Sequence, residues 1–536
     1  MGQVVREPTA DFTLVSADTV VPNADHKVLI TGLVDAATYD SVKVHTDKMV
    51  FQNYAGVENT DFGPRSQLAN MVREFKKSNS KSGFPEEHVT KFDVKPILEA
   101  VAGTAGTIVA TIAGSSTAAG TIDVTISSLD RKVTVAIPDA TAAADAAGLI
   151  KTAWDLEDLT SPYILAAPTA VMTWTCVHKG QDIDVGFMLD VSNCPGITLT
   201  SFVDGVAGAV NPDLTDVFDN VTNIRYNTIA WPFDESGAAD IDDISEPADF
   251  LDARFNAEAE VLDGVAICTM VDVVAGHSTK LALLNSKSLV TFLQQENGGE
   301  VRGEIVTPFA TSYELTARFC GVRARRFTAD HNISDIVVAN AALDQRGGPG
   351  SASLPYHNTP IDSELSFDGL GFTRANIKAL EALGGSIIGE NVVGNATILG
   401  AVRTTYKNDS AGNPDPTWGF LNYIDTSSQV REYMVNNVRD RYAQSRLTEG
   451  ILVRDREQEN AESISAFMDK LYSDLSGRSF ALTQAGEGPL NFFKDNKTVD
   501  LNLLTGAVII FMRVPIVTQI RNVIATIQIA FTVGEG

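Results

Sequence analysis

The alternation of apolar and polar residues is clearest at the C-terminal end of the chain. From Val523 to Val533, apolar side chains take every second position, with threonine and glutamine among the residues between them, which is the period of a half-buried β-strand. In residues 514–520 the alternation has the opposite phase, so Arg521 and Asn522 predict a bulge, a bend or a short turn. A strand at this position must pair within its own sheet or offer an unpaired edge to another molecule.

The N-terminal part begins with a weakly alternating stretch and continues with buried elements. Residues 1–25 contain Pro8 and Pro22 and predict an extended arm without a core of its own. Residues 26–34 predict a buried strand. Residues 62–79 predict a helix whose apolar positions share one face, with lysines in the last turn where the helix dipole favours cations.

From about residue 95 to 208 the composition shifts to alanine, glycine and threonine. Residues 121–137 alternate strictly on either side of a Ser-Ser-Leu-Asp turn and predict a hairpin. An alanine-rich helix is expected over 140–154, a second strand pair around Lys179 and Gly180, and a last strand over 196–202. We interpret this segment as an inserted β-rich module.

Residues 209–345 alternate predicted strands with predicted helices, which favours a βαβ layer with a mostly parallel sheet. The helix beginning near residue 246 has Ser245 as its expected N-cap and Pro247 in its first turn. Residues 264–271 form a continuous apolar run of the kind buried on both faces of a sheet.

A Gly/Pro/Ser-rich loop over 344–360 marks the best internal boundary. Beyond it we expect a helix capped by Thr373 and ended at Gly384, a strand beginning at 396 that continues through "RTTYKND" into a turn, and a long helix over 427–447. The pattern as a whole predicts a multidomain protein of the α/β and α+β classes.

Composition narrows the partners and the compartment. The 536 residues carry 41 Lys+Arg against 68 Asp+Glu, a formal charge of −27, which disfavours binding to nucleic acid or to an anionic membrane. The longest apolar run, residues 506–512, is too short to cross a membrane, and the first residues lack an apolar signal region. We therefore expect synthesis in the cytoplasm, with the four scattered cysteines as buried free thiols.

No motif in the sequence predicts catalysis, a cofactor or a metal. Gly369-Leu370-Gly371 does not complete a dinucleotide fingerprint, and the glycine-rich loop after Gln345 lacks the Gly-Lys-Ser/Thr of a phosphate loop. The seven histidines are isolated, and the acidic stretch 240–252 lacks calcium-loop spacing. Arg403 is open to two interpretations, an ordinary half-exposed hairpin residue or a structural ion pair or intersubunit contact.

Several stretches together resemble contractile tail sheath proteins, particularly those of Mu-like bacteriophages. "FGPRSQLANMVREF" is similar to a helix motif of that family, although Pro64-Arg65 replace a small residue; "GTIDVTI" and "HKGQDID" resemble its inserted domain; "TRANIKALEALGGSII" and "VRTTYKNDSAGNPDPTWGFLN" resemble its C-terminal domain. The motif positions are Phe62, Gly63, Ser66, Leu68, Met71, Arg403, Thr404, Thr405, Tyr406, Gly412 and Asp415.

The resemblance implies a structural subunit without chemistry that polymerises as stacked, usually hexameric rings around an inner tail tube. Contraction of the array would drive the tube through the host envelope during genome delivery. The implied partners are further copies of the chain, the tube, the baseplate and the tail terminator; the implied location is the virion tail, assembled in the bacterial cytoplasm. In that family, N- and C-terminal arms add strands to a neighbour's C-terminal domain. The arm residues expected to anchor here are Val523, Ile527, Ile529 and Phe531, and Val4, Phe12 and Leu14.

The expected organisation follows from pattern and resemblance together. It comprises an N-terminal arm (1–25), the first part of the core (26–94), the inserted module (95–208), an α/β domain (209–345), the C-terminal sheath domain (346–512) and the C-terminal arm (513–536), with the helix over 459–475 as a candidate tube contact. Three alternatives stay open: the sheath of a bacteriocin or injection system, a surface protein binding carbohydrate or a receptor through 95–208, and an enzyme with a carboxylate or Cys268 in a cleft.

Overall fold

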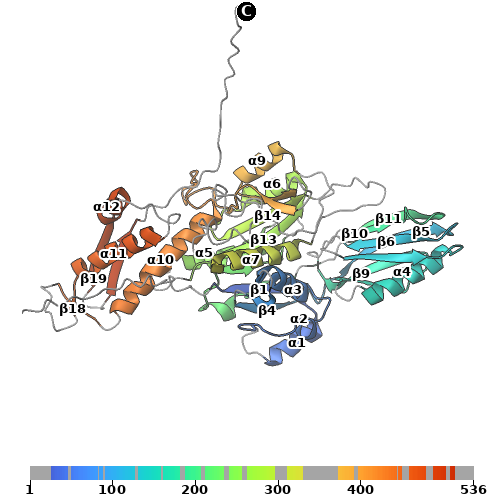
Figure 1. The fold of residues 1–536 in the computed structure, drawn as a ribbon, viewed down its shortest axis with the longest axis horizontal. Coiled ribbons are helices and arrows are strands. Elements are labelled where there is room, and N and C mark those ends of the chain that lie inside the picture. Colours follow the sequence, from blue (N-terminus) through green and yellow to red (C-terminus); the bar gives the residue numbers. More distant parts are fainter. Residues whose placement is uncertain are drawn as a thin grey trace, which may run out of the picture.

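The computed structural model shows an elongated molecule with a central sheet, a helical unit at one end and a β-rich module at the other (Figure 1). It describes residues 26–45, 50–81, 84–88, 91–126, 131–157, 161–180, 187–206, 210, 212–234, 241–255, 262–295, 311–329, 372–390, 396–442, 445–449, 458–478, 487–502 and 507–513. Among the described helices, none is both long enough and apolar enough to cross a membrane.

The central sheet has seven strands in the order β16-β15-β14-β13-β12-β1-β4. All neighbours are parallel except β15 and β16. The strands are β1 (Val28–Val34), β4 (Phe92–Leu98), β12 (Thr228–Ala230), β13 (Val265–Asp272), β14 (Leu289–Gln295), β15 (Ser386–Glu390) and β16 (Ala396–Leu399). The predicted parallel βαβ layer and the mixed fold class are therefore confirmed.

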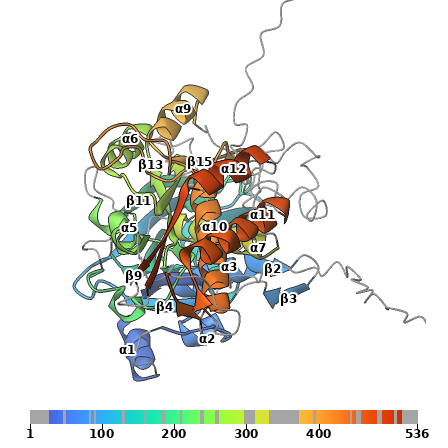
Figure 2. The same cartoon turned by 90° about the vertical axis from the view of Figure 1, so that its left-hand side faces the viewer.

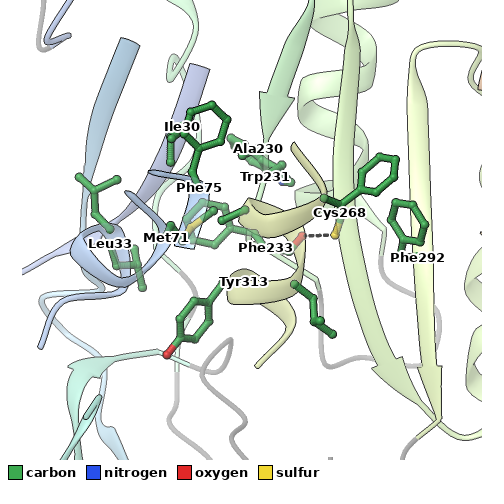
Figure 3. Packing of buried hydrophobic residues seen from close by; sticks show 14 of the residues in the cluster. Ile30, Leu33, Met71, Phe75, Ala230, Trp231, Phe233, Cys268, Phe292 and Tyr313 are labelled. Carbon is green, nitrogen blue, oxygen red and sulfur yellow. Dashed lines mark hydrogen bonds between the residues drawn. The ribbon is translucent and has the colours of Figure 1, made fainter. Parts of the chain in front are cut away.

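Helices pack on this sheet and form the main hydrophobic core with it. The helices α3 (Gln67–Asn79) and α7 (Ser312–Ala329) pack against each other and against β1, β12 and β13, whereas α5 (Asp242–Phe255) and α6 (Val274–Leu283) pack against β13. Figure 3 shows Met71 and Phe75 of α3 beside Ile30 of β1. This region also contains two short helices, α1 (Ala36–His45) and α2 (Glu58–Asp61), and the antiparallel strand pair β2 (Ser80–Lys81) and β3 (Phe84–His88).

The contact between α3 and α7 is close because Gly321 has no side chain. A Cβ there would lie 2.8 Å from the backbone oxygen of Phe75, closer than real contacts allow. Beside it, the guanidinium Nε of Arg318 donates to the Glu74 carboxylate over 2.6 Å, with both side chains buried. Shape and charge together fix the register of the two helices.

The described residues between β4 and β12 form two further sheets, one α-helix and a short 3₁₀ helix (Asp219–Val221). The strands β10-β6-β7 make one sheet and β11-β5-β9-β8 the other. The elements are β5 (Ala105–Gly114), β6 (Gly120–Ile126), β7 (Arg131–Ile137), α4 (Ala143–Glu157), β8 (Tyr163–Leu165), β9 (Val171–Lys179), β10 (Phe187–Asp190) and β11 (Ile197–Val206). The hairpin of β6 and β7 is confirmed. The predicted strand pair around Lys179 is wrong, because β9 and β10 belong to different sheets.

Two local predictions need correction for physical reasons. The helix α5 begins at Asp242, so Ser245 lies inside its first turn, where its hydroxyl donates to the Asp242 carbonyl instead of capping. The strand β16 ends at Leu399, and Gly400 has a φ of +76°, so residues 403–406 are irregular and not a strand. The cap at Thr373 is confirmed, because its side chain accepts from the amide of Asn376 at the start of α9 (Arg374–Ala382).

The C-terminal helices have a second, separate core. The long helix α10 (Leu421–Tyr442) leads from the sheet to α11 (Ala461–Arg478), α12 (Glu487–Asp495) and the hairpin of β19 (Lys497–Asn502) and β20 (Ala507–Met512), as Figures 1 and 2 show. A short pair, β17 (Arg446–Leu447) with β18 (Gln458–Glu459), lies between α10 and α11 in the sequence. Because β15 and β16 join the central sheet, the segment 346–512 contributes to both cores, which differs from the single unit expected.

Candidate functional site

The β19–β20 hairpin, here called the ribbon, is a two-stranded sheet at the C-terminal end of the described residues. Its strands pair over six residues, from Lys497 with Met512 to Asn502 with Ala507. Among the described residues no third strand joins it. A two-stranded ribbon is marginal unless a further strand or a helix supports it, so its two faces decide what it can do.

One face of the ribbon packs on helices. Val499 and Leu501 of β19 lie on this face with Val508, Ile510 and Met512 of β20, and Ile510 and Met512 pack against the second core. That core contains Met434 of α10 and the stacked rings of Tyr472 and Phe493, 4.5 Å apart. Lys497 adds an ion pair to Asp469 of α11.

The opposite face of the ribbon is exposed and carries two large apolar side chains. Ile509 and Phe511 are 59% and 60% exposed, and both come from β20. Their cross-strand partners are Asp500 and Thr498. An alternating strand that exposes large apolar side chains on one face and has unpaired edges is a template for another strand.

The chain runs from the ribbon into the predicted C-terminal arm. Residues 514–536 lie outside the described residues, as do residues 1–25. The predicted arm anchors Val523, Ile527, Ile529 and Phe531, and Val4, Phe12 and Leu14, are therefore not placed by the structure. Their pairing with a ribbon stays a prediction.

The first of the motifs that resemble sheath proteins forms the start of α3 and its contact with the sheet. Phe62 packs edge-on to Phe51 at 5.4 Å, and Gly63 has a φ of +82°. The Ser66 hydroxyl accepts from the amide of Ala69 over 3.0 Å and so caps the helix. Leu68 lies against Gly32 of β1, and Met71 is buried.

Arg65, at the place where the sequence departs from the family pattern, joins this motif to the inserted module. Its guanidinium donates to the carbonyl oxygens of Ser161 and Tyr163 over 3.2 and 3.0 Å. The neighbouring amide of Gln67 donates to Nε2 of buried His178 over 3.0 Å. Sequence reasoning missed this junction, because the partners lie about 100 residues away in the chain.

The second family motif forms an irregular segment beside the central sheet. The Arg403 guanidinium lies 4.5 Å from the ring of Phe420, and burial lowers the pKa of Arg403 against the opposing charge of Glu381. The Thr404 hydroxyl donates to the Trp418 carbonyl over 2.5 Å. The Thr405 amide donates to the Leu289 carbonyl over 2.9 Å, which attaches the segment to β14.

Beyond this segment, residues 406–417 form a loop organised by two aspartates. Asp415 accepts from the hydroxyl of Tyr406 over 2.7 Å and from the amide of Thr417. Asp409 accepts from the amide of Asn413, and Gly412 has a φ of +82°. Hydrogen bonds from Asn413 and from Thr417 lower the pKa values of Asp409 and Asp415, respectively. The loop is thus held by ionised carboxylates.

The described residues contain no group of three or more His, Cys, Asp or Glu side chains that could hold a metal ion. The four cysteines are buried free thiols. Burial lowers the pKa of His277 to about 4, although its hydrogen bond to the Gln294 carbonyl opposes that shift. We place these groups in the cores of the fold.

Comparison with known proteins finds a relative by sequence. No protein-family model matches the chain. Over 235 residues the chain is 29% identical to the Mu-like prophage FluMu tail sheath protein of Haemophilus influenzae. The chain is homologous to a Mu-like tail sheath protein. The resemblance inferred from the motifs is confirmed to that extent.

The match covers 42% of this chain and 44% of that sheath protein, so the chain spans less than half the length of its curated relative. Among solved structures, the sheath tail protein of Desulfitobacterium hafniense aligns with 89% of this chain and 90% of its own, at 12% identity and a TM-score of 0.40.

Proposed function

We propose that this chain is the structural subunit of a contractile tail sheath. It assembles as stacked helical rings around an inner tail tube, and contraction of the array drives the tube through the host envelope during genome delivery. The observation that carries the proposal is the homology to a phage tail sheath protein. Its tail location, its assembly in the host cytoplasm and its partners, which are the tube, the baseplate and the tail terminator, belong to the same proposal.

The ribbon supports a route to polymerisation. A strand from a neighbouring copy would satisfy the edge of the ribbon through many backbone hydrogen bonds at once. The predicted arm of residues 513–536 has the alternation that such a strand needs. Separately from this edge pairing, the exposed face with Ile509 and Phe511 would pack against the surface of a neighbouring copy.

The work of contraction would come from repacking of subunits, not from nucleotide hydrolysis, because packed interfaces can be bistable. A gain of about 1 to 3 kcal/mol per interface, the scale of ordinary coupling energies, would sum to hundreds of kcal/mol over an array. A structural role without catalysis is part of this proposal. A bacteriocin or injection-system sheath would use the same assembly and is separated from a phage tail by the neighbouring genes.

Electron microscopy of the purified chain across a salt series tests the proposal. Because like-charged copies repel, the formal charge of −27 predicts that added salt promotes assembly. We expect striated hollow cylinders from the full chain, and monodisperse folded particles from a chain ending at residue 512. Truncated chains that still form cylinders would refute the arm route, and full chains that stay monodisperse with their cognate tube would refute the sheath function.

A further inference from the structure

The helix α10 connects the central sheet to the ribbon and carries two opposed faces. Val430 and Met434 face the second core, with Val438 one turn further along. Asp425, Ser428 and Glu432 recur at spacings of three and four residues on another face. Leu421 and Ile424, at the start of the helix, belong to the main core. One continuous helix is therefore anchored in both cores (Figure 1).

The first polar contact of α10 is a buried ion pair. The Arg323 guanidinium of α7 donates to the Asp425 carboxylate, and both side chains are almost fully buried. The same guanidinium donates to the Asn227 carbonyl over 2.9 Å and to the Thr228 hydroxyl at the start of β12. Arg323 thus ties α10 to a central strand of the sheet.

The second polar contact centres on Asp263, two residues before the start of β13. Its carboxylate is 1% exposed and lies 2.7 Å from Nη2 of Arg431 and 3.7 Å from Nη2 of Arg225. Arg225 also pairs with Glu432 at 2.5 Å and donates to the Ser428 hydroxyl over 2.8 Å. Arg431 further donates to the carbonyl of Phe255 at the end of α5 over 2.7 Å.

These buried charge pairs lie between α10 and the central sheet. Removing two opposite charges from water is costly, so a buried pair contributes little net stability but strongly penalises any arrangement in which it is broken. A charge network of this kind specifies geometry. Here it lies where a small change in the direction of α10 would swing the ribbon through a large arc.

We propose that Asp263, Arg323 and Asp425 are positioning residues that clamp α10 to the central sheet, so that the sheet and the ribbon form one rigid body. If the proposed function holds, the ribbon of a subunit in a sheath moves only when the whole subunit moves.

Distance measurements between spin labels test the clamp in the unassembled chain. Cysteines replace exposed Thr279 on α6 and exposed Lys494 on α12, and the four buried native thiols are left unlabelled by brief reaction. Pulsed electron paramagnetic resonance on the parent should give a single narrow distance. Asp263→Asn and Asp425→Asn should lose it and give a broad distribution, while circular dichroism stays unchanged.

Two further variants separate positioning from general stability. Asp440→Asn, exposed on the same helix, should keep the narrow distance. Glu432→Gln removes the negative charge that pairs with Arg225 at a half-buried site, and it should broaden the distance distribution less than Asp263→Asn does. This milder variant replaces Asp263→Asn in the test if Asp263→Asn does not fold. A narrow distance in folded Asp263→Asn, Asp425→Asn and Glu432→Gln would overturn the clamp. A parent that shows a narrow distance but never assembles would leave the clamp standing and count against the sheath function.

Discussion

Replacing Phe511 by serine tests whether the open face of the ribbon is buried on assembly. The side chain is 60% exposed in the subunit. A phenylalanine presents about 200 Å², so about 120 Å² would be covered by a neighbour. At about 25 cal/mol per Å² this is worth about 3 kcal/mol per contact, or about a hundredfold in the dissociation constant.

The same change should leave the isolated subunit almost untouched. Since Phe511 packs little within the subunit, Phe511→Ser should alter the free energy of unfolding by less than about 1 kcal/mol. The critical concentration for cylinder formation, measured by sedimentation, should rise about a hundredfold. Val57→Ser, at a site 62% exposed beside the short helix α2, is the matched control and should assemble like the parent. An unchanged critical concentration for Phe511→Ser would refute burial of this face.

Three other changes probe the rest of the fold. Glu74→Ala removes the carboxylate partner of buried Arg318 and should lower the unfolding free energy by about 3 to 5 kcal/mol, measured by chemical denaturation; a loss below 1 kcal/mol would contradict the pairing. Lowering the pH should release the loop 406–417. The pKa values of Asp409 and Asp415 in the folded protein lie below their ordinary 3.8, so these carboxylates stabilise the loop above pH 3.8 and the stabilisation is lost as the pH falls through the folded pKa. Amide chemical shifts around Gly412 that stay constant from pH 5 to about pH 2 would exclude this. Arg65→Met should raise the rate of hydrogen exchange at residues 161–163, while exchange in α7 stays at the rate of the unmodified protein. If the rate at residues 161–163 is also unchanged, Arg65 does not hold the module.

The sequence predicted the elements that one local period determines. The run at 264–271 became β13, buried on both faces, and the alternation at 121–137 became the hairpin of β6 and β7. The Thr373 cap was also confirmed. In each case the deciding interactions lie within a few residues or follow from burial alone.

Pairing between distant segments could not be predicted in the same way. The strands β9 and β10 were both found in the pattern, yet their partners depend on which sheet each edge meets across the module. Strand β16 ends early because Gly400 turns the chain, which the apolar pattern does not record. The ribbon was not predicted for a similar reason. Residues 506–512 read as one short apolar run, and only the pairing of β20 with β19 shows which of its side chains face the helices and which face outward.

The contacts that clamp α10 to the central sheet could not be predicted from the sequence at all. On sequence alone, Asp425, Arg431 and Glu432 are ordinary charges on an amphipathic helix and would be assigned to solvent. Asp263, the partner of Arg431, and Arg225, the partner of Glu432, lie more than 160 residues earlier in the chain, and Arg323, the partner of Asp425, lies 102 residues earlier. No spacing rule links them. Only the burial of Asp263, where two guanidinium groups converge on one carboxylate, distinguishes a positioning contact from a solvated face. If that carboxylate sets the direction of α10, the residues that govern how a sheath moves lie in the interior of the subunit, away from the surfaces where copies meet.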